Sequence, residues 1–132
     1  MKKYLAIFGA LTIAACTHVP SNIAGNQVFF DFDSAEISDE ARDELESQAL
    51  YMKKNPDTSI VIEGHCDERG STEYNLALGA LRAGNAAHEI IYHGVESERI
   101  KTVSYGKENP IYPGTGEEVW SKNRNTTTRV AK

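Results

Sequence analysis

The 132-residue sequence predicts a single α/β domain, in which helices lie mainly on one face of a mixed four-stranded sheet. Two observations carry this prediction. Short apolar or β-branched runs alternate along the chain with longer segments whose apolar residues recur at helical spacing. The length suits one domain, and a composition of 40% hydrophobic and 25% charged residues is that of an ordinary globular protein.

The first fifteen residues are typical of a secretory signal peptide. Lys2 and Lys3 precede an apolar stretch from Leu5 to Ile13, and small residues then follow up to Cys16. A transmembrane helix would need about 20 apolar residues, so this stretch is too short to be one. We therefore expect residues 1–15 to be a leader that is removed from the mature protein.

The tetrapeptide at 13–16 (IAAC) resembles the bacterial lipobox, which implies cleavage before Cys16 and a lipid on its thiol. A single acyl chain binds membranes only marginally, so the triacylated N-terminus that the resemblance implies is what would anchor the protein. Thr17 stands where an Asp favours retention in the inner membrane, so we expect an outer-membrane lipoprotein with its domain facing the periplasm. Lipidation of Cys16 leaves Cys66 without a disulfide partner.

Residues 17–26 are polar and show no periodicity, so they are interpreted as a short tether. The expected organisation is a signal peptide at 1–15, a lipidated N-terminus and tether at 16–26, and a folded domain at 27–132.

The first half of the predicted domain has the order strand, helix, strand. The aromatic run from Gln27 to Phe32 predicts a first strand that packs on both faces. Ser38 is a suitable N-cap for a helix that ends near Lys54, and Ser59 to His65 predicts a second buried strand. A right-handed crossover would make the two strands parallel. The core face of this helix is predicted to contain Ala41, Leu45, Ala49 and Met52.

A second helix is predicted between Ser71, as its cap, and Gly94, as its stop. Ile100 to Tyr105 predicts a third strand, a short helical turn is expected near Glu117 to Lys122, and residues 126–131 form a weak last strand. The predicted core face of the second helix contains Leu76, Ala80, Ala83, Ala87, Ile90 and Ile91.

The charge and the few reactive side chains exclude several functions. A net charge of −5 argues against nucleic-acid binding, which needs a clustered basic surface. His65 and Cys66 are neighbours on a strand and point to opposite faces, whereas a metal site needs three or four converging ligands. A cysteine nucleophile would need an oriented base. We therefore expect no metal, no cofactor and no enzymatic activity, with Cys66 as a small buried filler.

Three segments resemble the OmpA-like family: VFFDFDSAEI (28–37), VIEGHCDERGSTEYNLALG (61–79) with Arg82-Ala83, and VSYGKENP (103–110). The resemblance implies binding to the stem peptide of peptidoglycan, chiefly to its meso-diaminopimelate residue, and partnership with proteins of the Tol system. It predicts an outer-membrane lipoprotein that tethers its membrane to the cell wall without a covalent bond. The alternative is a Tol-type interaction module with weak or no wall binding.

The end of the diaminopimelate side chain carries an ammonium and a carboxylate on one carbon, so its site needs an anion and a cationic fork a few ångströms apart. Asp67 and Arg82 match the family's pattern for this pair. Asp67 follows the carboxyl end of a strand, where ligands bind in open α/β sheets, and Arg82 would hold the carboxylate bidentately. The alternative is a structural salt bridge from Asp67 to a nearby arginine such as Arg69.

Asn75, Gly79 and Arg82 fall on one face of the second helix, which is predicted to differ from its core face. Asn75 is a further ligand candidate. Gly79 is either a tolerated interruption or a place where a ligand or loop comes close. Family members often carry Asn where this chain has Gly84, which should cost about 1 kcal/mol of helix stability.

Two further pairs of residues belong to the expected site. Asp33 and Ser34 end the first strand and either contact the ligand or serve only the turn. Asn123 and Arg124 match the family's C-terminal block, which makes Arg124 a ligand candidate, but Asn125 stands where the family has a second arginine. The last strand has also lost apolar residues, so we expect it to be an edge or frayed strand.

Overall fold

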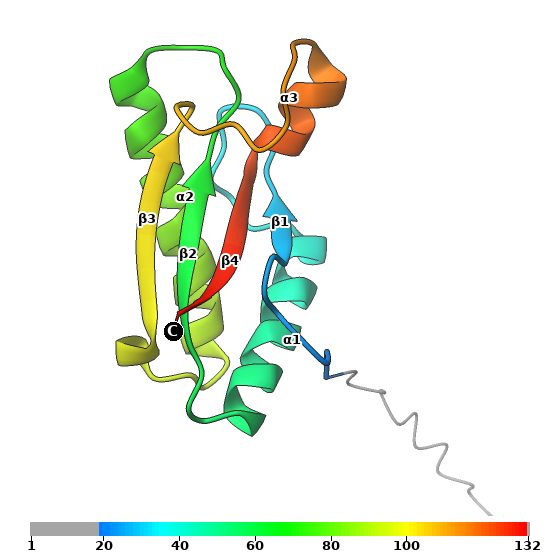
Figure 1. Cartoon of the computed structure of the whole chain (residues 1–132), viewed down its shortest axis with the longest axis vertical. Helices are drawn as coiled ribbons and strands as arrows, with labels where there is room; N and C mark the ends of the chain where they lie inside the picture. The colour runs from blue at the N-terminus through cyan, green and yellow to red at the C-terminus, as the bar shows by residue number, and fades with distance from the viewer. Residues whose placement is uncertain (1–18, 132) are drawn as a thin grey trace, which may run out of the picture.

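The computed structural model describes residues 19–131, which form one sheet with three α-helices (Figure 1). The predicted signal peptide, Cys16 and Thr17 lie outside the described residues. None of the helices between residues 19 and 131 is long and apolar enough to cross a membrane. The elements are β1 (Gln27–Phe29), α1 (Asp39–Lys54), β2 (Ser59–His65), α2 (Thr72–Tyr92), the 3₁₀ turn η1 (Ser97–Arg99), β3 (Ile100–Gly106), α3 (Glu117–Asn123) and β4 (Asn125–Ala131).

The four strands have the spatial order β1-β4-β2-β3. β4 is antiparallel to β1 and to β2, whereas β2 and β3 are parallel. β1 and β2 therefore point the same way, as predicted, but are not neighbours. Helices α1 and α2 cover one face of the sheet (Figure 1). The predicted mixed sheet with helices mainly on one face is confirmed.

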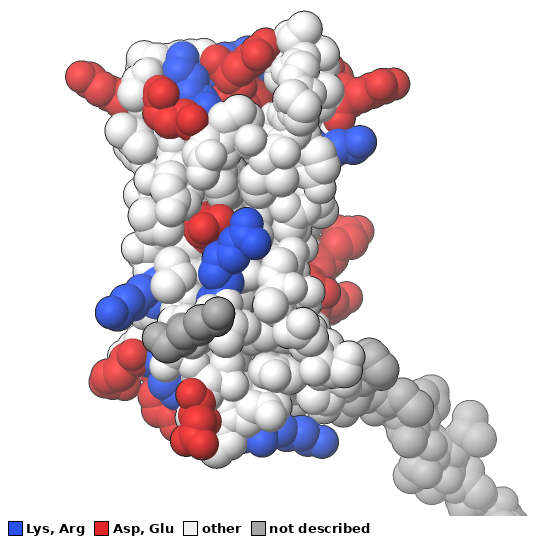
Figure 2. Space-filling view, in the orientation of Figure 1, with Lys and Arg blue, Asp and Glu red and all other residues white. Residues whose placement is uncertain are grey.

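Within residues 19–131, no helical layer covers the opposite face of the sheet. Figure 2 looks onto this face and shows that charged side chains gather towards the two ends of the molecule. Across the middle, Arg129 on β4 approaches Glu63 on β2 at 3.4 Å. This distribution leaves the two ends, rather than the flat sheet face, as the places where charge is concentrated.

The expectation of an edge or frayed last strand is wrong, because β4 lies in the middle of the sheet. Residues 125–128 are buried, although all are polar. Their side chains find partners: the Thr128 hydroxyl lies 2.6 Å from Gln48 Oε1 on α1, and the Thr127 hydroxyl lies 2.8 Å from Asn125 Oδ1. These hydrogen bonds offset the cost of burying polar side chains. The strand can therefore lie in the middle of the sheet without apolar residues at these positions.

The predicted core face of α1 is confirmed, since Ala41, Leu45, Ala49 and Met52 are all buried. The predicted core face of α2 is partly wrong: Leu76, Ala80 and Ile91 are exposed. The residues that α2 does bury are Asn75, Leu78, Gly79, Arg82, Ala83, Ala86, Ala87 and Ile90. The face that carries Asn75 and Arg82 is therefore the core face, contrary to expectation, because buried hydrogen-bond acceptors satisfy both polar side chains.

β1 is shorter than predicted and packs on one face only. Phe30 is buried, but Phe29 and Phe32 are 48% and 60% exposed. The helices cover one face of the sheet, so Phe29 points to the uncovered face, whereas Phe32 is exposed because β1 ends at Phe29 and Phe32 lies in the loop that follows.

The predicted tether is also shorter than expected at its C-terminal end. Ile23 is fully buried in the core, and the Gly25 amide donates to the Thr128 carbonyl at 2.7 Å. The Asn26 side chain donates to Glu44 at 2.8 Å. The packed domain therefore begins at about Ile23 rather than at Gln27.

Helix α2 packs closely against the sheet where Gly79 on α2 contacts Gly64 on β2. A Cβ atom built on Gly79 would overlap the Ser104 hydroxyl, and one built on Gly64 would overlap the Gly79 carbonyl. Gly79 therefore lets the helix come close to a neighbouring group, and that group is the sheet rather than a ligand. Ser71 caps this helix as predicted, because its hydroxyl accepts from the Tyr74 amide at 3.1 Å.

Candidate ligand-binding site

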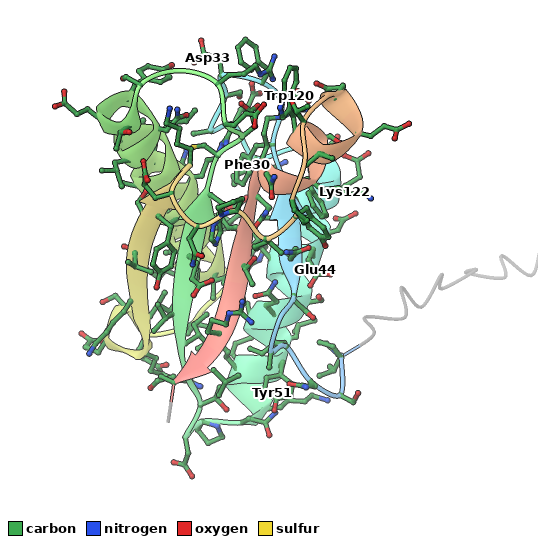
Figure 3. The ribbon with its side chains drawn as sticks, turned by 45° about the horizontal axis from the view of Figure 1, so that its top comes forward. Phe30, Asp33, Glu44, Tyr51, Trp120 and Lys122 are labelled. Atoms are coloured by element: carbon green, nitrogen blue, oxygen red, sulfur yellow. The ribbon has the colours of Figure 1, made fainter. Side chains whose placement is uncertain are left out.

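A pocket of about 400 Å³ lies at the end of the sheet where β1 and β2 finish. The loops after these strands and the first turns of α2 form its walls, and α3 lies beside it. Figure 3 places Asp33 and Trp120 at this end of the molecule. The size falls in the range of small-molecule sites. Its lining contains Phe32, Asp33, Cys66, Asp67, Arg69, Gly70, Tyr74, Asn75, Leu78 and Arg82.

Asp67 is a buried carboxylate, 4% exposed, that is held by two arginines. Arg69 donates to both of its oxygens, at 3.2 and 2.8 Å from the side chain and at 3.0 Å from the amide. Arg124 Nη1 lies 3.5 Å from Oδ2. Burial alone would raise the pKa of Asp67, but the hydrogen bonds and charge of Arg69 outweigh it and lower the pKa, so the carboxylate is ionised at neutral pH.

Arg69 is itself fixed by aromatic stacking. Its guanidinium carbon lies 4.0 Å from the centre of the Phe32 ring and 4.1 Å from that of Trp120. Trp120 donates through its indole nitrogen to Glu68 at 3.2 Å. Cation–π contacts of this kind stabilise a planar cation between two rings. The salt bridge between Asp67 and Arg69, the alternative that the sequence left open, is present. The stacking of Arg69 on Phe32 and Trp120 connects the loop after β2 to the loop after β1 and to α3.

Arg82 is a buried cation, 1% exposed, whose hydrogen-bond partners are main-chain carbonyls. Nε donates to Ser34 at 2.8 Å, Nη1 to His65 at 2.9 Å and Nη2 to Asp31 at 3.1 Å. Burial lowers the pKa of Arg82, but a guanidinium stays protonated in proteins. Because a guanidinium has five N–H groups, these three hydrogen bonds leave further donor capacity on its terminal nitrogens, where the Cys66 thiol is also a neighbour.

The structure brings Asp67 and Arg82 to the same pocket without pairing them. Among the described residues, Arg82 has no carboxylate within salt-bridge distance, so no side chain neutralises its charge by direct contact. A buried charge without a counter-ion is costly. The pocket is therefore suited to a ligand that brings a carboxylate to Arg82.

Asn75 and Cys66 lie on the wall of the pocket but serve the fold as well. The Asn75 amide donates to the carbonyls of Arg69 and Ser71 at 2.8 and 3.0 Å, which holds the loop before α2. The Cys66 thiol donates to the Asn75 carbonyl at 3.3 Å. Burial raises the pKa of Cys66, so the thiol is protonated at neutral pH and is a poor nucleophile.

Asp33 and Ser34 are both close to the pocket but have different roles. Asp33 lines it, has a positive φ of 55° and accepts a hydrogen bond from the Tyr74 hydroxyl. The Ser34 hydroxyl accepts from the Glu36 amide at 3.1 Å, which is turn chemistry, while its carbonyl holds Arg82. Asp33 thus remains available to a ligand, and Ser34 positions the arginine.

Arg124 and Asn123 brace the site from α3. Arg124 donates to Glu117 at 2.8 Å and to the Phe30 carbonyl at 3.0 Å, besides its contact with Asp67. The Asn123 side chain exchanges two hydrogen bonds with the Tyr112 main chain. Arg124 therefore acts on the site through Asp67 rather than by lining the pocket.

The sequence did not predict the apolar wall of the pocket. Phe32 was expected in a strand, and residue spacing gave no role in the site to Tyr74 or Leu78, which line the pocket, or to Trp120, which stacks on Arg69. Tyr74 is 52% exposed, and an exposed tyrosine beside a helix cap is a signal that could have pointed to it. The stacking of Phe32 and Trp120 on Arg69 involves segments far apart in the chain, which residue spacing cannot show.

His65 is buried beside the site and does not point to a metal centre. Its ring stacks on Tyr105 with centroids 5.5 Å apart, and Nε2 lies 3.4 Å from Glu63. Burial lowers the pKa of His65, which favours the neutral ring. Between residues 19 and 131, no group of three or more His, Cys, Asp or Glu side chains is arranged to hold a metal ion.

Comparison with known proteins identifies the family of this chain. The model of the OmpA family matches residues 29–124, which is most of the chain. The chain therefore belongs to the OmpA family, as the sequence segments predicted.

Several relatives carry the name peptidoglycan-associated lipoprotein. The chain is 43% identical over 123 residues to the one from Mesorhizobium japonicum, covering 93% of this chain and 73% of the relative. It is 33% identical to the one from Haemophilus influenzae, with 94% of both chains covered. A relative in Rhizobium meliloti is 45% identical, but the match spans 59% of its length.

Solved structures support the same fold. The crystal structure of the peptidoglycan-associated lipoprotein from Burkholderia pseudomallei superimposes with a TM-score of 0.77 at 39% identity, covering 80% of this chain and 89% of that one. The C-terminal domain of Helicobacter pylori MotB gives a TM-score of 0.75 at 24% identity, covering 81% and 84% of the two chains. The second likeness concerns the fold alone.

Proposed function

We propose that this protein binds peptidoglycan non-covalently through the diaminopimelate residue of the stem peptide. Asp67 receives the ammonium of the diaminopimelate side chain, and Arg82 receives the carboxylate on the same carbon. Phe32, Tyr74 and Leu78 provide apolar walls for the methylene chain between the charged end and the rest of the peptide. The proposal involves no catalytic step.

The observation that carries this proposal is the unneutralised cation Arg82 in a pocket that also holds a carboxylate. A ligand with both charges on one carbon would complement both groups at once. Asp67 keeps its contacts with Arg69 and Arg124, so the ammonium adds to these ion pairs instead of replacing them. The names of the relatives point to the same ligand class.

We also propose that Cys16 carries the lipid and that the protein is an outer-membrane lipoprotein with residues 1–15 as its leader. The lipobox-like segment and Thr17 support this. Partnership with Tol-system proteins is proposed from the family resemblance. A Tol-type interaction module with weak or no wall binding remains the alternative, and direct binding to purified walls separates the two.

The test is co-sedimentation of the purified protein with peptidoglycan sacculi that contain diaminopimelate. The wild-type protein should sediment with the sacculi, and free stem peptide should compete. Asp67→Asn removes the charge but keeps the shape, and loss of a charge-assisted hydrogen bond of about 1.5–3 kcal/mol should weaken binding about tenfold to a hundredfold.

Asp57→Asn is the matched control, because it removes the same charge from an exposed turn far from the pocket. This control should bind like the wild type. Thermal unfolding of both variants must show a folded domain. Full binding by folded Asp67→Asn would contradict the proposed site, and absence of wild-type binding would favour the Tol-type alternative.

A further inference from the structure

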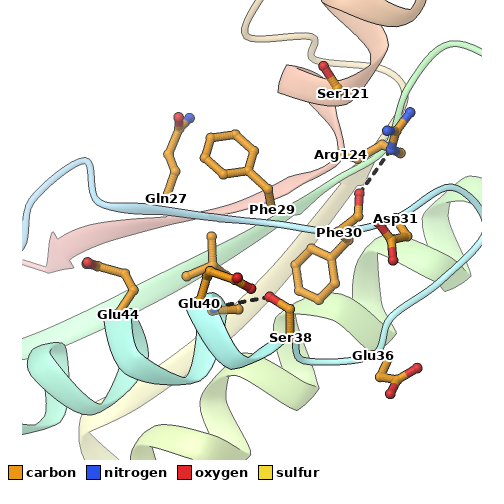
Figure 4. Close-up of a pocket in the computed structure, with 12 residues that line it drawn as sticks. Gln27, Phe29, Phe30, Asp31, Glu36, Ser38, Glu40, Glu44, Ser121 and Arg124 are labelled. Atoms are coloured by element: carbon orange, nitrogen blue, oxygen red, sulfur yellow. Dashed lines mark hydrogen bonds between the residues drawn. The ribbon is translucent and has the colours of Figure 1, made fainter.

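A second groove lies between β1 and the beginning of α1, and none of its lining residues lines the proposed ligand pocket. Its volume is about 580 Å³, and it follows β1 and the loop after it (Figure 4). Gln27 and Phe29 point away from α1 in this view, whereas Phe30 points towards it. The groove therefore follows one exposed margin of the sheet.

Among residues 19–131, no strand pairs with the side of β1 that faces this groove. β1 is the first strand in the spatial order, so its only neighbour in the sheet is β4. The Asn26 carbonyl accepts from Thr128, and the Phe30 amide donates to Arg124, so these residues face β4. Because alternate residues of an edge strand face opposite sides, the N–H and C=O groups of Gln27 and Phe29 face the groove.

The two edges of the sheet are protected differently. β3, the other edge strand, carries Lys101, and its pairing with β2 shifts register after Gly64. A lysine and a register irregularity both discourage pairing with another chain. β1 contains no charged residue or proline, and Phe29 is 48% exposed. The β1 edge is thus the one left open to an added strand.

The side of the groove formed by α1 and its preceding loop is acidic. Asp31, Glu36, Glu40 and Glu44 line it, and the one basic lining residue, Arg124, is already bound to Glu117 and Asp67. On the flank where Figure 1 places β1 and α1, Figure 2 shows acidic atoms and no basic ones at mid-height. The groove therefore selects a partner with positive charge.

We propose that this groove binds an extended basic segment of a partner protein, which adds to β1 as a fifth strand. The segment's main chain pairs with Gln27 and Phe29, as in other cases of strand addition. Its side chains alternate, so basic residues face Glu36 and Glu40 on one side while apolar residues lie beside Phe29 on the other. This interaction uses none of the residues that line the proposed wall-binding pocket.

The test uses an acetylated, amidated heptapeptide that alternates lysine and valine, titrated into the full chain in a non-ionic detergent. Binding should slow hydrogen exchange at the amides of Gln27 and Phe29, as expected for new main-chain hydrogen bonds. A Glu36→Gln/Glu40→Gln double variant should bind the peptide about threefold more weakly or worse, since exposed ion pairs contribute modestly. The matched control, Asp57→Asn/Glu98→Gln, removes two charges elsewhere and should bind normally.

Two further peptides separate strand addition from simple charge attraction. An N-methylated version of the lysine peptide keeps the charge but loses main-chain donors and should not bind. A glutamate version should not bind either. Equal binding by either peptide, or binding that leaves the Gln27 and Phe29 amides unchanged, would overturn the proposal. So would a dimer of the protein that dissociates on Phe29→Lys, because a second copy would then occupy the groove.

Discussion

Arg82 contributes both to the stability of the fold and, as proposed, to ligand binding. Its guanidinium holds together the end of β2 and the loop after β1 through three carbonyls. The same side chain lines the ligand pocket. Residue type and the family resemblance pointed to Arg82 as a ligand residue, but not to its burial, because the three acceptors come from segments that are distant in sequence.

Arg82→Lys should impair both properties although it keeps the charge. A lysine has a single nitrogen, so it cannot reach three carbonyls and also offer a fork to a carboxylate. Loss of buried hydrogen bonds should lower the free energy of unfolding by about 1–3 kcal/mol. Sacculus binding by the folded variant should fall about tenfold. Denaturant unfolding and co-sedimentation measure the two effects, and unchanged wall binding would contradict the proposed role.

At the scale of elements, β4 shows where sequence reasoning failed and why. The three threonines at 126–128 have low hydrophobicity, which predicted a strand at the edge of the sheet. The sequence could not predict the role of Gln48 on α1, whose side-chain oxygen accepts a hydrogen bond from the Thr128 hydroxyl. In contrast, α1, β2 and the limits of α2 were predicted well, because caps and apolar spacing are local signals.

The contact between α2 and the sheet gives a paired prediction for two glycines of one helix. Gly79→Ala should destabilise the protein by about 1–3 kcal/mol, because the added methyl group overlaps the Ser104 hydroxyl and makes a tight contact with the Gly64 carbonyl. Gly84→Ala meets no atom within 4 Å and should stabilise it by about 0.5–1 kcal/mol through helix propensity. Thermal unfolding of the two variants checks this. The same sign for both would show that propensity, rather than packing, governs this helix.

At the scale of the whole molecule, a domain that packs from Ile23 onward leaves few residues between the fold and the proposed lipid at Cys16. Because an extended chain spans at most about 3.6 Å per residue, the domain would stay within about 25 Å of its membrane. The ligand pocket and the β1 groove have no lining residue in common, but Arg124 of the groove contacts Asp67 of the pocket, so the two sites adjoin.

Cys16→Ser tests the proposed anchor. Without a thiol at this position no lipid can be attached, so the variant should leave the membrane fraction. The measurement is fractionation after the sacculi have been digested, which removes any attachment through the wall. A variant that still fractionates with the outer membrane would show that the anchor lies elsewhere.

The recognition of diaminopimelate is tested most directly by comparing two kinds of wall. Sacculi with lysine in place of diaminopimelate keep the ammonium that Asp67 would bind but lack the carboxylate that Arg82 would bind. The wild-type protein should therefore bind them about tenfold or more weakly, and Arg82→Ala should lose little further affinity for them. Equal wild-type affinity for both walls would contradict the pairing of Arg82 with the ligand carboxylate.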